Sequence, residues 1–529
     1  MKRLNIASEG YVTYIEKERV WIMTKKKSLT VTFWISALIC LIFVIAGIIM
    51  PKQLEKGTTA VTEFIAINFS WYYLLLMLVI LIVCIYLLFS RYSSITLGKE
   101  GEEPEFSLGS WFAMLFSAGM GIGLVFWTTA EPLSHAFKMT PLHKAGTQEA
   151  INDGLRFSFF HWGIHAWAVY GIVALVFAYF SFHRGYPGLV SATLTPLFGK
   201  KLMQGPLGSI IDILAIIATI TGVAATVGFS ALQINEGLKF LFDIPSNFTV
   251  QLIITVIAAI FFTWSAWSGI NKGIKFLSNI NMVLAFVVLI LVFLLGPTLY
   301  ILNMFANTLG DYIANFFGMS LRIPINGGEK LKWVRSWTIF YWAWWISWAP
   351  FVGIFIARVS RGRTIKEFIV GVLFVPSLVC FMFFTVFGAS ALYLQKEKHV
   401  KLSEQATETT TFAMFQELPM GMILSIITLA VIAIFFITSA DSATYVLGML
   451  SSKGDIQPSS LVKVTWGIIL ALFGLIMLYT GGITAIQNLL IIAALPFSII
   501  IILMMWSLLR ALNEERPRYS KQKREKYKS

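Results

Sequence analysis

The chain has 529 residues, of which 57% are hydrophobic and only 13% are charged. Ordinary soluble domains carry about 25% charged residues, so this composition excludes a typical soluble enzyme and indicates a membrane protein. The formal net charge of +14 fits basic residues gathered on the cytoplasmic side of a membrane, and no nucleic-acid partner is expected. The cysteines Cys40, Cys84 and Cys380 lie in apolar segments and are expected in the core, without a disulfide or a metal.

Twelve apolar segments are long enough to cross a bilayer as α-helices, which takes about 20 residues each. They lie at 31–50, 69–89, 108–130, 155–182, 210–240, 250–268, 276–303, 334–357, 368–394, 419–449, 461–480 and 485–511. Twelve spans place both termini on one side of the membrane, and most of the 41 lysine and arginine residues fall on that side. Both termini are therefore predicted to be cytoplasmic.

Two further segments are predicted to lie at the membrane surface. Leu309–Arg322 is too short and too polar to span, and its apolar positions recur at helical spacing, so it is predicted to be an amphipathic helix along the outer surface. The C-terminal tail after Arg510 is rich in basic residues. It either forms a solvated cytoplasmic anchor or contacts anionic lipid, which is worth about 1 kcal/mol per basic residue near the surface.

The third segment contains the glycine motif Gly119-Met120-Gly121-Ile122-Gly123. A phosphate-binding loop would need a preceding strand and an aqueous helix start, so that interpretation is rejected. Each glycine costs about 1 kcal/mol in a helix interior, and the three together favour an unwound segment. Unwound backbone at bilayer depth is buried in protein or lines a cavity, and broken helices bind substrates and ions in transporters. Close helix packing through small residues is the alternative.

Aromatic residues are concentrated in two of the predicted spans. In the eighth span, one side of the helix carries Trp342, Trp345 and Trp348. In the fourth span, an arc of about 140° carries Trp162, Trp167 and Tyr170. Such density at mid-span does not fit an interfacial belt, although a plain packed core remains an alternative. Aromatic faces suit a quaternary ammonium ion, which has no N–H to donate but is attracted to each ring by about 0.5–2 kcal/mol.

Hydroxyl groups in the tenth span suggest a cation site. Thr438 and Ser439 offer hard oxygen ligands that suit Na⁺. Asp441 is either functional, as intramembrane carboxylates are by default, or hydrogen-bonded at a hydrated helix end. His161 and His165 lie one turn apart, but no carboxylate or cysteine accompanies them in the sequence, so no metal beyond sodium is expected. No nucleophile–base pair is found, so no catalytic residues are assigned and the chain is not expected to be an enzyme.

Together these features resemble the betaine/carnitine/choline transporter (BCCT) family over nearly the whole chain. The most specific marks are the glycine motif, the Glu131-Pro132 pair, the stretch Trp342–Phe351 and the run Arg358–Arg363. The resemblance implies an all-α, leucine-transporter-like fold of 12 transmembrane helices with two inverted five-helix repeats, and a homotrimer that associates through the helix at 309–322. The implied layout is an N-terminal cytoplasmic tail (1–30), two additional helices (31–107), the first repeat (108–303), the surface helix and loop (304–333), the second repeat (334–511) and a basic tail (512–529).

The resemblance also implies the roles of individual residues. The implied aromatic box consists of Trp162, Trp167, Tyr170 and Trp345, with Trp348 near the inward pathway. The backbone near the substrate would come from Gly119, Met120, Gly121 and Gly123. One sodium ion would bind among Ala118, Met120, Phe435, Thr438 and Ser439, and a second near Thr219 and Phe351. The second site departs from the family pattern, because Val223 stands where sodium-coupled betaine transporters carry a threonine.

The implied function is secondary transport across the cell membrane. Gly123 stands where choline-preferring members of the family tend to carry aspartate, which favours a zwitterionic substrate. We therefore predict import of glycine betaine, or a related quaternary-ammonium solute, by sodium symport for osmoprotection. No cofactor is expected besides the coupling ion Na⁺. Choline or carnitine transport and sodium-independent betaine/carnitine exchange are the alternatives.

Overall fold

The computed structural model describes the backbone of residues 29–99, 101–119, 121–268 and 271–526, and the side chains of the same residues apart from 118, 271–275 and 516–526. Every regular element within these ranges is a helix, and a single antiparallel bridge joins Thr96 to Thr364. The predicted all-α class is therefore confirmed.

The α-helices are α2 (Val31–Ile49), α3 (Pro51–Phe89), α4 (Leu108–Gly119), α5 (Ile122–Phe137), α6 (Gln148–Trp162), α7 (Ile164–Ala178), α8 (Val190–Thr193), α9 (Thr195–Phe198), α10 (Lys200–Met203), α11 (Pro206–Phe242), α12 (Phe248–Ser268), α13 (Asn271–Leu295), α14 (Thr298–Ala314), α15 (Phe316–Ser320), α16 (Gly328–Trp333), α17 (Phe340–Val359), α18 (Ile365–Phe383), α19 (Ser390–Glu397), α20 (Thr410–Gln416), α21 (Gly421–Ser451) and α22 (Ser460–Lys526). Short π-helical turns extend three of them: η1 (Tyr179–His183), η2 (Val334–Ile339) and η3 (Phe384–Ala389); η4 (Leu402–Glu404) is a 3₁₀ turn.

Within the described ranges, ten helical stretches are long and apolar enough to cross a membrane, and eleven if the bent pair α4–α5 counts as one span. The spans predicted at 461–480 and 485–511 both lie in α22, which is interrupted at Gly482 (φ 57°, ψ −132°). Glycine adopts such a backbone conformation readily, whereas other residues do not. The predicted number of twelve depends on counting the two sides of Gly482 separately, and it stays a prediction.

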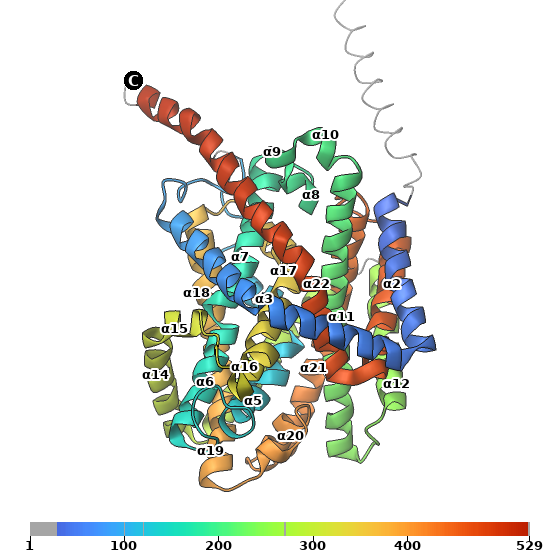
Figure 1. Cartoon of the computed structure of the whole chain (residues 1–529), viewed down its shortest axis with the longest axis vertical. Coiled ribbons are helices and arrows are strands. Elements are labelled where there is room, and N and C mark those ends of the chain that lie inside the picture. The colour runs from blue at the N-terminus through green and yellow to red at the C-terminus, as the bar shows by residue number, and fades with distance from the viewer. Residues whose placement is uncertain (1–28, 100, 120, 269–270, 527–529) are drawn as a thin grey trace, which may run out of the picture.

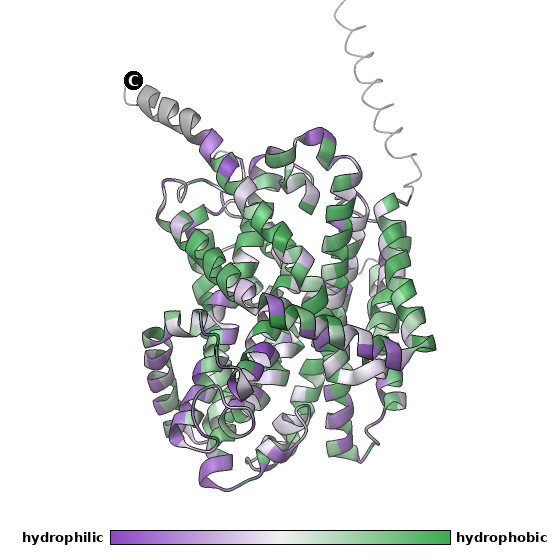
Figure 2. Cartoon of the chain, in the orientation of Figure 1, coloured by the Kyte–Doolittle hydropathy of each residue, from purple (hydrophilic) through white to green (hydrophobic). Residues whose placement is uncertain are grey.

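The helices form a bundle (Figure 1) whose central helices are more deeply buried than its outer ones. In the most apolar 18-residue stretch of Gln148–His183, and in that of Gly328–Val359, 94% of the residues are buried. In the corresponding stretch of Phe248–Ser268 only 17% are buried. The 39-residue helix α3 runs obliquely and packs against α7 and α22. Apolar residues dominate the middle of the bundle and hydrophilic residues gather mostly toward its two ends (Figure 2). Side chains on α6, α7 and α17 therefore face protein, which is where a substrate site within the bundle requires them.

The three cysteines are buried in the bundle, as the sequence predicts. Cys40, Cys84 and Cys380 lie on α2, α3 and α18, and no disulfide joins them. Burial in apolar surroundings is the usual place of a structural cysteine.

Both described ends of the chain lie at the same end of the bundle, the upper end in Figure 1. Near the end of α22, Glu515 accepts hydrogen bonds from Tyr179 (2.8 Å) and Arg184 (3.0 Å), which follow α7. His183, also bonded to Glu515 (3.1 Å), contacts the carbonyl of Gly98. The end of α7, the loop after α3 and the C-terminal helix are thus tied together at this end.

The region of the predicted surface helix differs from the prediction in its boundaries. The predicted seventh span ran to residue 303, but α13 ends at Leu295 and α14 begins after Pro297, which has no N–H to continue a helix. The helix predicted over 309–322 is divided at Asn315, whose side-chain amide donates to the carbonyl of Asp311 (2.9 Å) and so competes with the backbone pattern. Ile313 and Phe317 are 67% and 70% exposed, as an apolar face turned toward lipid requires.

Candidate substrate and ion site

The third predicted span is broken at the glycine motif. The helix over Leu108–Ser117 and the helix over Ile122–Phe137 differ in direction by 68°. Gly121 precedes α5 in a non-helical conformation (φ −136°, ψ −146°); Met120 lies outside the described residues, as does the side chain of Ala118. The predicted break is therefore present, and the first N–H groups of α5 have no partner within their own helix.

The fourth predicted span is broken as well, which the sequence analysis missed. Trp162 is the last residue of α6, whereas Trp167 and Tyr170 lie on α7 beyond Gly163 (φ −93°, ψ −142°). The placement of all three on one continuous helix was therefore wrong. A Cβ atom at residue 163 would lie 2.5 Å from the backbone carbonyl of Phe159 and 2.8 Å from the ring of Phe381 on α18, so the local backbone and the packing of α18 together explain the glycine.

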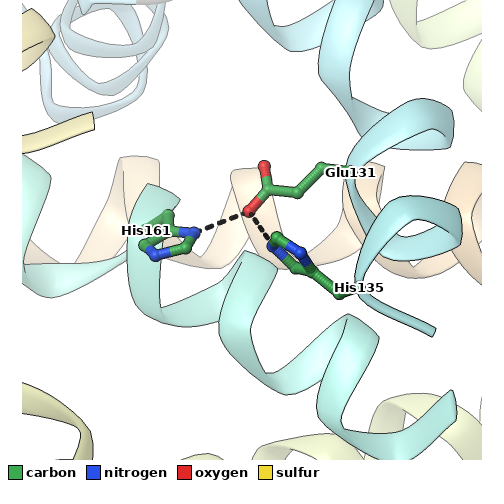
Figure 3. Close-up of side chains that lie close together, drawn as sticks. All are labelled: Glu131, His135 and His161. Carbon is green, nitrogen blue, oxygen red and sulfur yellow. Dashed lines mark hydrogen bonds and ion pairs between the residues drawn. The ribbon is translucent and has the colours of Figure 1, made fainter. Parts of the chain in front are cut away.

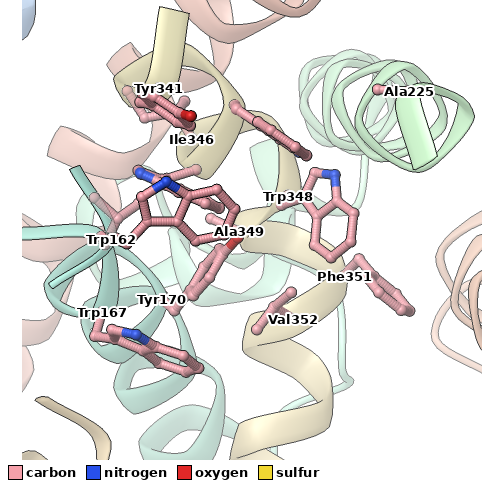
Figure 4. Close-up of a cluster of buried hydrophobic side chains, with 14 of the residues drawn as sticks. Trp162, Trp167, Tyr170, Ala225, Tyr341, Ile346, Trp348, Ala349, Phe351 and Val352 are labelled. Atoms are coloured by element: carbon pink, nitrogen blue, oxygen red, sulfur yellow. The ribbon is translucent and has the colours of Figure 1, made fainter. Parts of the chain in front are cut away.

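The members of the predicted aromatic box nevertheless come together, and three of them, Trp162, Trp167 and Tyr170, are seen beside α17 in Figure 4. Trp162 meets Trp345 edge to face with ring centroids 4.9 Å apart, and Tyr170 meets Trp345 in the same way at 5.9 Å. Trp167 lies against Tyr170 at 5.7 Å. All four side chains are at most 2% exposed. The rings contact one another, so a ligand among them would be enclosed on several sides by aromatic faces.

The hydrogen-bonding groups of the box differ in their availability. The indole N–H of Trp345 donates to the carbonyl of His161 (2.9 Å). The hydroxyl of Tyr170 is buried and has no hydrogen-bond partner among the described residues. It is therefore a donor that a substrate carboxylate could use.

The remaining tryptophans of α17 fall into different surroundings. Trp348 donates its N–H to the carbonyl of Gly222 on α11 (2.7 Å), and so joins the two helices beside the box. Trp344 stacks on Trp345 with centroids 5.4 Å apart and planes 12° apart, so it backs the box, although no role was predicted for it. Trp342 stacks instead on His165, away from the box rings.

The glycines of the motif lie where the aromatic rings leave no room for a side chain. A Cβ atom at Gly123 would be 2.8 Å from Trp344 and 3.1 Å from Trp162, and one at Gly119 would collide with Trp167. The broken span and the box are therefore in direct contact, with the backbone of the motif against the rings. This is the juxtaposition that a backbone-lined substrate site needs.

The first predicted sodium site is partly described. A Cβ atom at Gly121 would lie 3.5 Å from the hydroxyl oxygen of Ser439 on α21, which places the unwound backbone beside this hydroxyl. Thr438 donates its hydroxyl proton to the carbonyl of Ile434 (2.9 Å) and leaves its oxygen lone pairs for a cation. Phe435, one turn earlier, is buried on the same helix.

The second predicted sodium site lies at the contact between α11 and α17. Thr219 and Phe351 each lie one turn from the Trp348–Gly222 hydrogen bond and are both buried. Val223 is also fully buried and adds no oxygen. The second set of ligands is thus poorer in oxygen than the first.

A buried carboxylate beside the box was left without a role by the sequence analysis. Glu131 on α5 is fully buried and lies within hydrogen-bond distance of His135 (3.2 Å) and His161 (2.7 Å) (Figure 3). It also accepts from the N–H of Trp162 (2.9 Å) and the hydroxyl of Tyr341 (2.6 Å). The Glu131-Pro132 pair had been noted only as a family mark, and the separation of these five residues in the sequence hid their contact.

No metal was expected at His161 because no carboxylate accompanies it in the sequence, but in the structure Glu131 lies beside it. Three ligand atoms from Glu131, His135 and His161 lie within 4.8 Å of one another. However, Trp333 donates its N–H to Nδ1 of His135 (3.0 Å), which leaves Nε2 of a neutral ring carrying the proton that points at Glu131. That nitrogen is then a donor and not a metal ligand, so the geometry favours a hydrogen-bonded cluster.

Two other polar residues are in ordinary surroundings. His165 contacts the hydroxyl of Ser320 (2.9 Å) and does not join His161 in a common site. Asp441 faces the side chain of Ser265 on the neighbouring helix α12. The contact favours the structural interpretation of Asp441.

Known proteins resemble this chain over most of its length. The model of the betaine/carnitine/choline family transporters matches residues 31–517. The glycine betaine transporter OpuD of Bacillus subtilis (strain 168) is 51% identical over 490 residues, which cover 93% of this chain and 96% of the relative. An ectoine/hydroxyectoine transporter of Virgibacillus pantothenticus is 42% identical (91% and 96% covered), and the betaine/ectoine transporter LcoP of Corynebacterium glutamicum is 39% identical (92% and 79% covered).

Proposed function

Because the chain belongs to the betaine/carnitine/choline transporter family, we propose that it imports glycine betaine by sodium symport. The chain is a multi-pass membrane transporter and not an enzyme. The observation that carries the proposal is the contact between the aromatic box and the glycine motif of the broken third span. The most similar relative reported above is named as a glycine betaine transporter.

The box suits the trimethylammonium group of glycine betaine. Ring faces of Trp162, Tyr170 and Trp345 attract a cation that cannot donate hydrogen bonds, at about 0.5–2 kcal/mol per ring. The carboxylate of the substrate can accept a hydrogen bond from the unpartnered hydroxyl of Tyr170 and from N–H groups in the first turn of α5 that have no acceptor within their own helix. Gly123 adds no charge of its own, so a zwitterion is favoured over choline.

Sodium supplies the electrical work, because glycine betaine is net neutral. The first sodium ion binds among Ala118, Met120, Phe435, Thr438 and Ser439. A second ion at Thr219 and Phe351 is less favoured, because Val223 offers no oxygen. One charge moved through 100 mV is worth about 2.3 kcal/mol, which sustains about a 40-fold concentration ratio at 1.4 kcal/mol per tenfold.

The proposed mechanism is alternating access in a leucine-transporter-like fold of twelve spans and two inverted repeats. The buried, mutually contacting box rings suit a conformation closed to both sides, from which one bundle of helices rocks against the other. We propose that both termini face the cytoplasm, because the basic run Arg358–Arg363 is hydrogen-bonded to Leu97 in the loop after α3, at the same end of the bundle as the two described ends of the chain. We further propose that the import serves osmoprotection and that the basic tail contacts anionic lipid. The protein would form a homotrimer through the region 309–322.

Labelled uptake in a host without its own compatible-solute transporters tests this function. Cells that produce the protein should accumulate glycine betaine in Na⁺ medium, and replacement of Na⁺ by K⁺ should abolish the uptake. Uptake that is unaffected by K⁺ would support sodium-independent exchange instead. Saturable uptake of carnitine or choline without uptake of glycine betaine would reassign the substrate.

Ectoine is the second candidate substrate. Two of the relatives reported above are named as ectoine transporters. Ectoine is also a zwitterion, but its delocalised cation carries N–H groups that an aromatic box cannot satisfy. We therefore expect unlabelled ectoine to compete with labelled glycine betaine only weakly. If ectoine competes as well as unlabelled glycine betaine does, the site recognises the zwitterion and not the quaternary ammonium group.

A further inference from the structure

We propose that Glu131 is a positioning residue for the aromatic box, holding Trp162 directly and Trp345 through His161. The proposal rests on the function proposed above, because it concerns the site for that substrate. Glu131 does not belong to the box itself. It lies on α5, beyond the broken segment, and its carboxylate is fully buried.

Four donors from three helices fill the hydrogen-bonding capacity of this carboxylate. Oε1 faces His135 and His161, and Oε2 faces Trp162 and Tyr341. An ionised carboxylate has about four lone-pair sites and no donor, so two donors per oxygen satisfy it completely. An apolar side chain at this place would leave several buried donors without a partner, which is costly in a membrane protein.

The donors lead directly to the box. Trp162 is fixed by its N–H, and its ring meets Trp345 at 4.9 Å. His161 is held by Oε1 and its backbone carbonyl receives the N–H of Trp345 (2.9 Å). Tyr341 stacks on Trp345 with planes 17° apart. One carboxylate thus sets the orientation of two opposing rings, and it ties α5, α6 and α17 together.

The direction of two of these hydrogen bonds is fixed. Trp162 has only a donor, and His135 must donate from Nε2 because Trp333 occupies Nδ1. His161 and Tyr341 can reverse, since a neutral imidazole nitrogen or a hydroxyl can also accept. A glutamine at residue 131 can therefore turn its oxygen toward Trp162 and Tyr341, and then its only conflict is with the distant His135 (3.2 Å).

Two substitutions separate the reach of this side chain from its charge. Glu131→Gln keeps the reach without the charge, and Glu131→Asp keeps the charge but withdraws the acceptor by about 1.5 Å, the length of one C–C bond. At that distance the hydrogen bond to Trp162 is lost. We expect Glu131→Asp to raise KM for glycine betaine about tenfold, and Glu131→Gln to raise it less than threefold.

The measurement is KM and transport rate per molecule, with the amount of protein in the membrane determined separately, and Kd for glycine betaine on purified protein. A merely structural role lowers the amount and the thermal stability but leaves Kd unchanged. Asp212 on α11 provides the matched control, because it is a second buried carboxylate and its partner is Ser191 on α8, and neither helix carries a box residue. Asp212→Asn should leave Kd unchanged.

The ordering of the two variants decides the outcome. If Glu131→Asp binds glycine betaine normally, or if Glu131→Gln loses as much affinity as Glu131→Asp, the positioning role is wrong. If the Asp variant does not reach the membrane, Tyr341→Phe is tested in its place, because it removes one hydrogen-bond donor from Oε2 of Glu131 and keeps the aromatic ring. Its KM should rise about threefold, and an unchanged KM would overturn the proposal. Absence of glycine betaine uptake by the unmodified chain would instead refute the proposed function.

Discussion

Replacement of Trp345 by leucine tests the role of the aromatic box most sharply among single substitutions. Trp345 is the member that contacts both Trp162 (4.9 Å) and Tyr170 (5.9 Å). Leucine keeps an apolar side chain but removes the ring face. The substitution therefore removes attraction for the ammonium group without adding a charge, and it also removes the N–H that the carbonyl of His161 accepts.

The expected magnitude follows from the burial of the ring. A desolvated cation–π contact is worth about 2 kcal/mol, which is about a 30-fold loss of affinity at 1.4 kcal/mol per tenfold. Loss of the hydrogen bond from the indole to His161 frees the neighbouring rings and adds to this loss. KM for glycine betaine should therefore rise at least about 30-fold.

The assay is uptake of labelled glycine betaine over a range of concentrations, normalised to the amount of protein in the membrane. Trp342→Leu is the matched control, because Trp342 lies on the same helix and is equally buried, and its ring contacts Phe160, His161 and His165 but none of the four box rings. Both variants lose the same volume from the core, so only Trp345→Leu should change KM strongly. An unchanged KM in Trp345→Leu, or an equal rise in Trp342→Leu, would refute the assignment of the box.

Three further predictions concern the glycine motif, the second sodium site and the C-terminal helix. Gly123→Ala places a methyl group 2.8 Å from a box-backing ring and should weaken glycine betaine binding about tenfold, whereas Gly109→Ala, with nothing within 4 Å, should not; Kd measurements compare the two. Val223→Thr restores a hydroxyl ligand and should steepen the sodium dependence of uptake, and an unaltered curve would argue against a second site there. Glu515→Gln weakens three hydrogen bonds and should lower the free energy of unfolding by about 1–3 kcal/mol, seen as a lower Tm in detergent. Glu404→Gln, in an exposed ion pair, should leave Tm unchanged.

The sequence predicts the features that depend on local composition. Apolar length locates the helices, and the three closely spaced glycines predict the break before α5. The density of tryptophan on α17 singles out the stretch Trp342–Trp348, and the resemblance to the family selects Trp345 within it, whose ring does meet those of Trp162 and Tyr170. These signals are strong because several residues of one kind lie within one or two turns.

Other features escape prediction because single residues or long-range contacts determine them. A lone glycine interrupts the helix at Gly163, and the pair Gly481-Gly482 interrupts α22, yet glycines are common in membrane helices and one or two carry little information. The role of Glu131 depends on donors from α6 and α17 that are up to 210 positions away along the chain. Trp344 received no role because helical spacing alone does not tell which ring faces a neighbour on another helix.

The most direct test of sodium-coupled betaine import is accumulation by the purified protein in proteoliposomes. An inward Na⁺ gradient with a negative interior potential should drive labelled glycine betaine above its external concentration, and K⁺ in place of Na⁺ should abolish this accumulation. The same proteoliposomes loaded with unlabelled glycine betaine distinguish exchange from symport. Accumulation that needs internal substrate and proceeds equally well in K⁺ would contradict the proposed function.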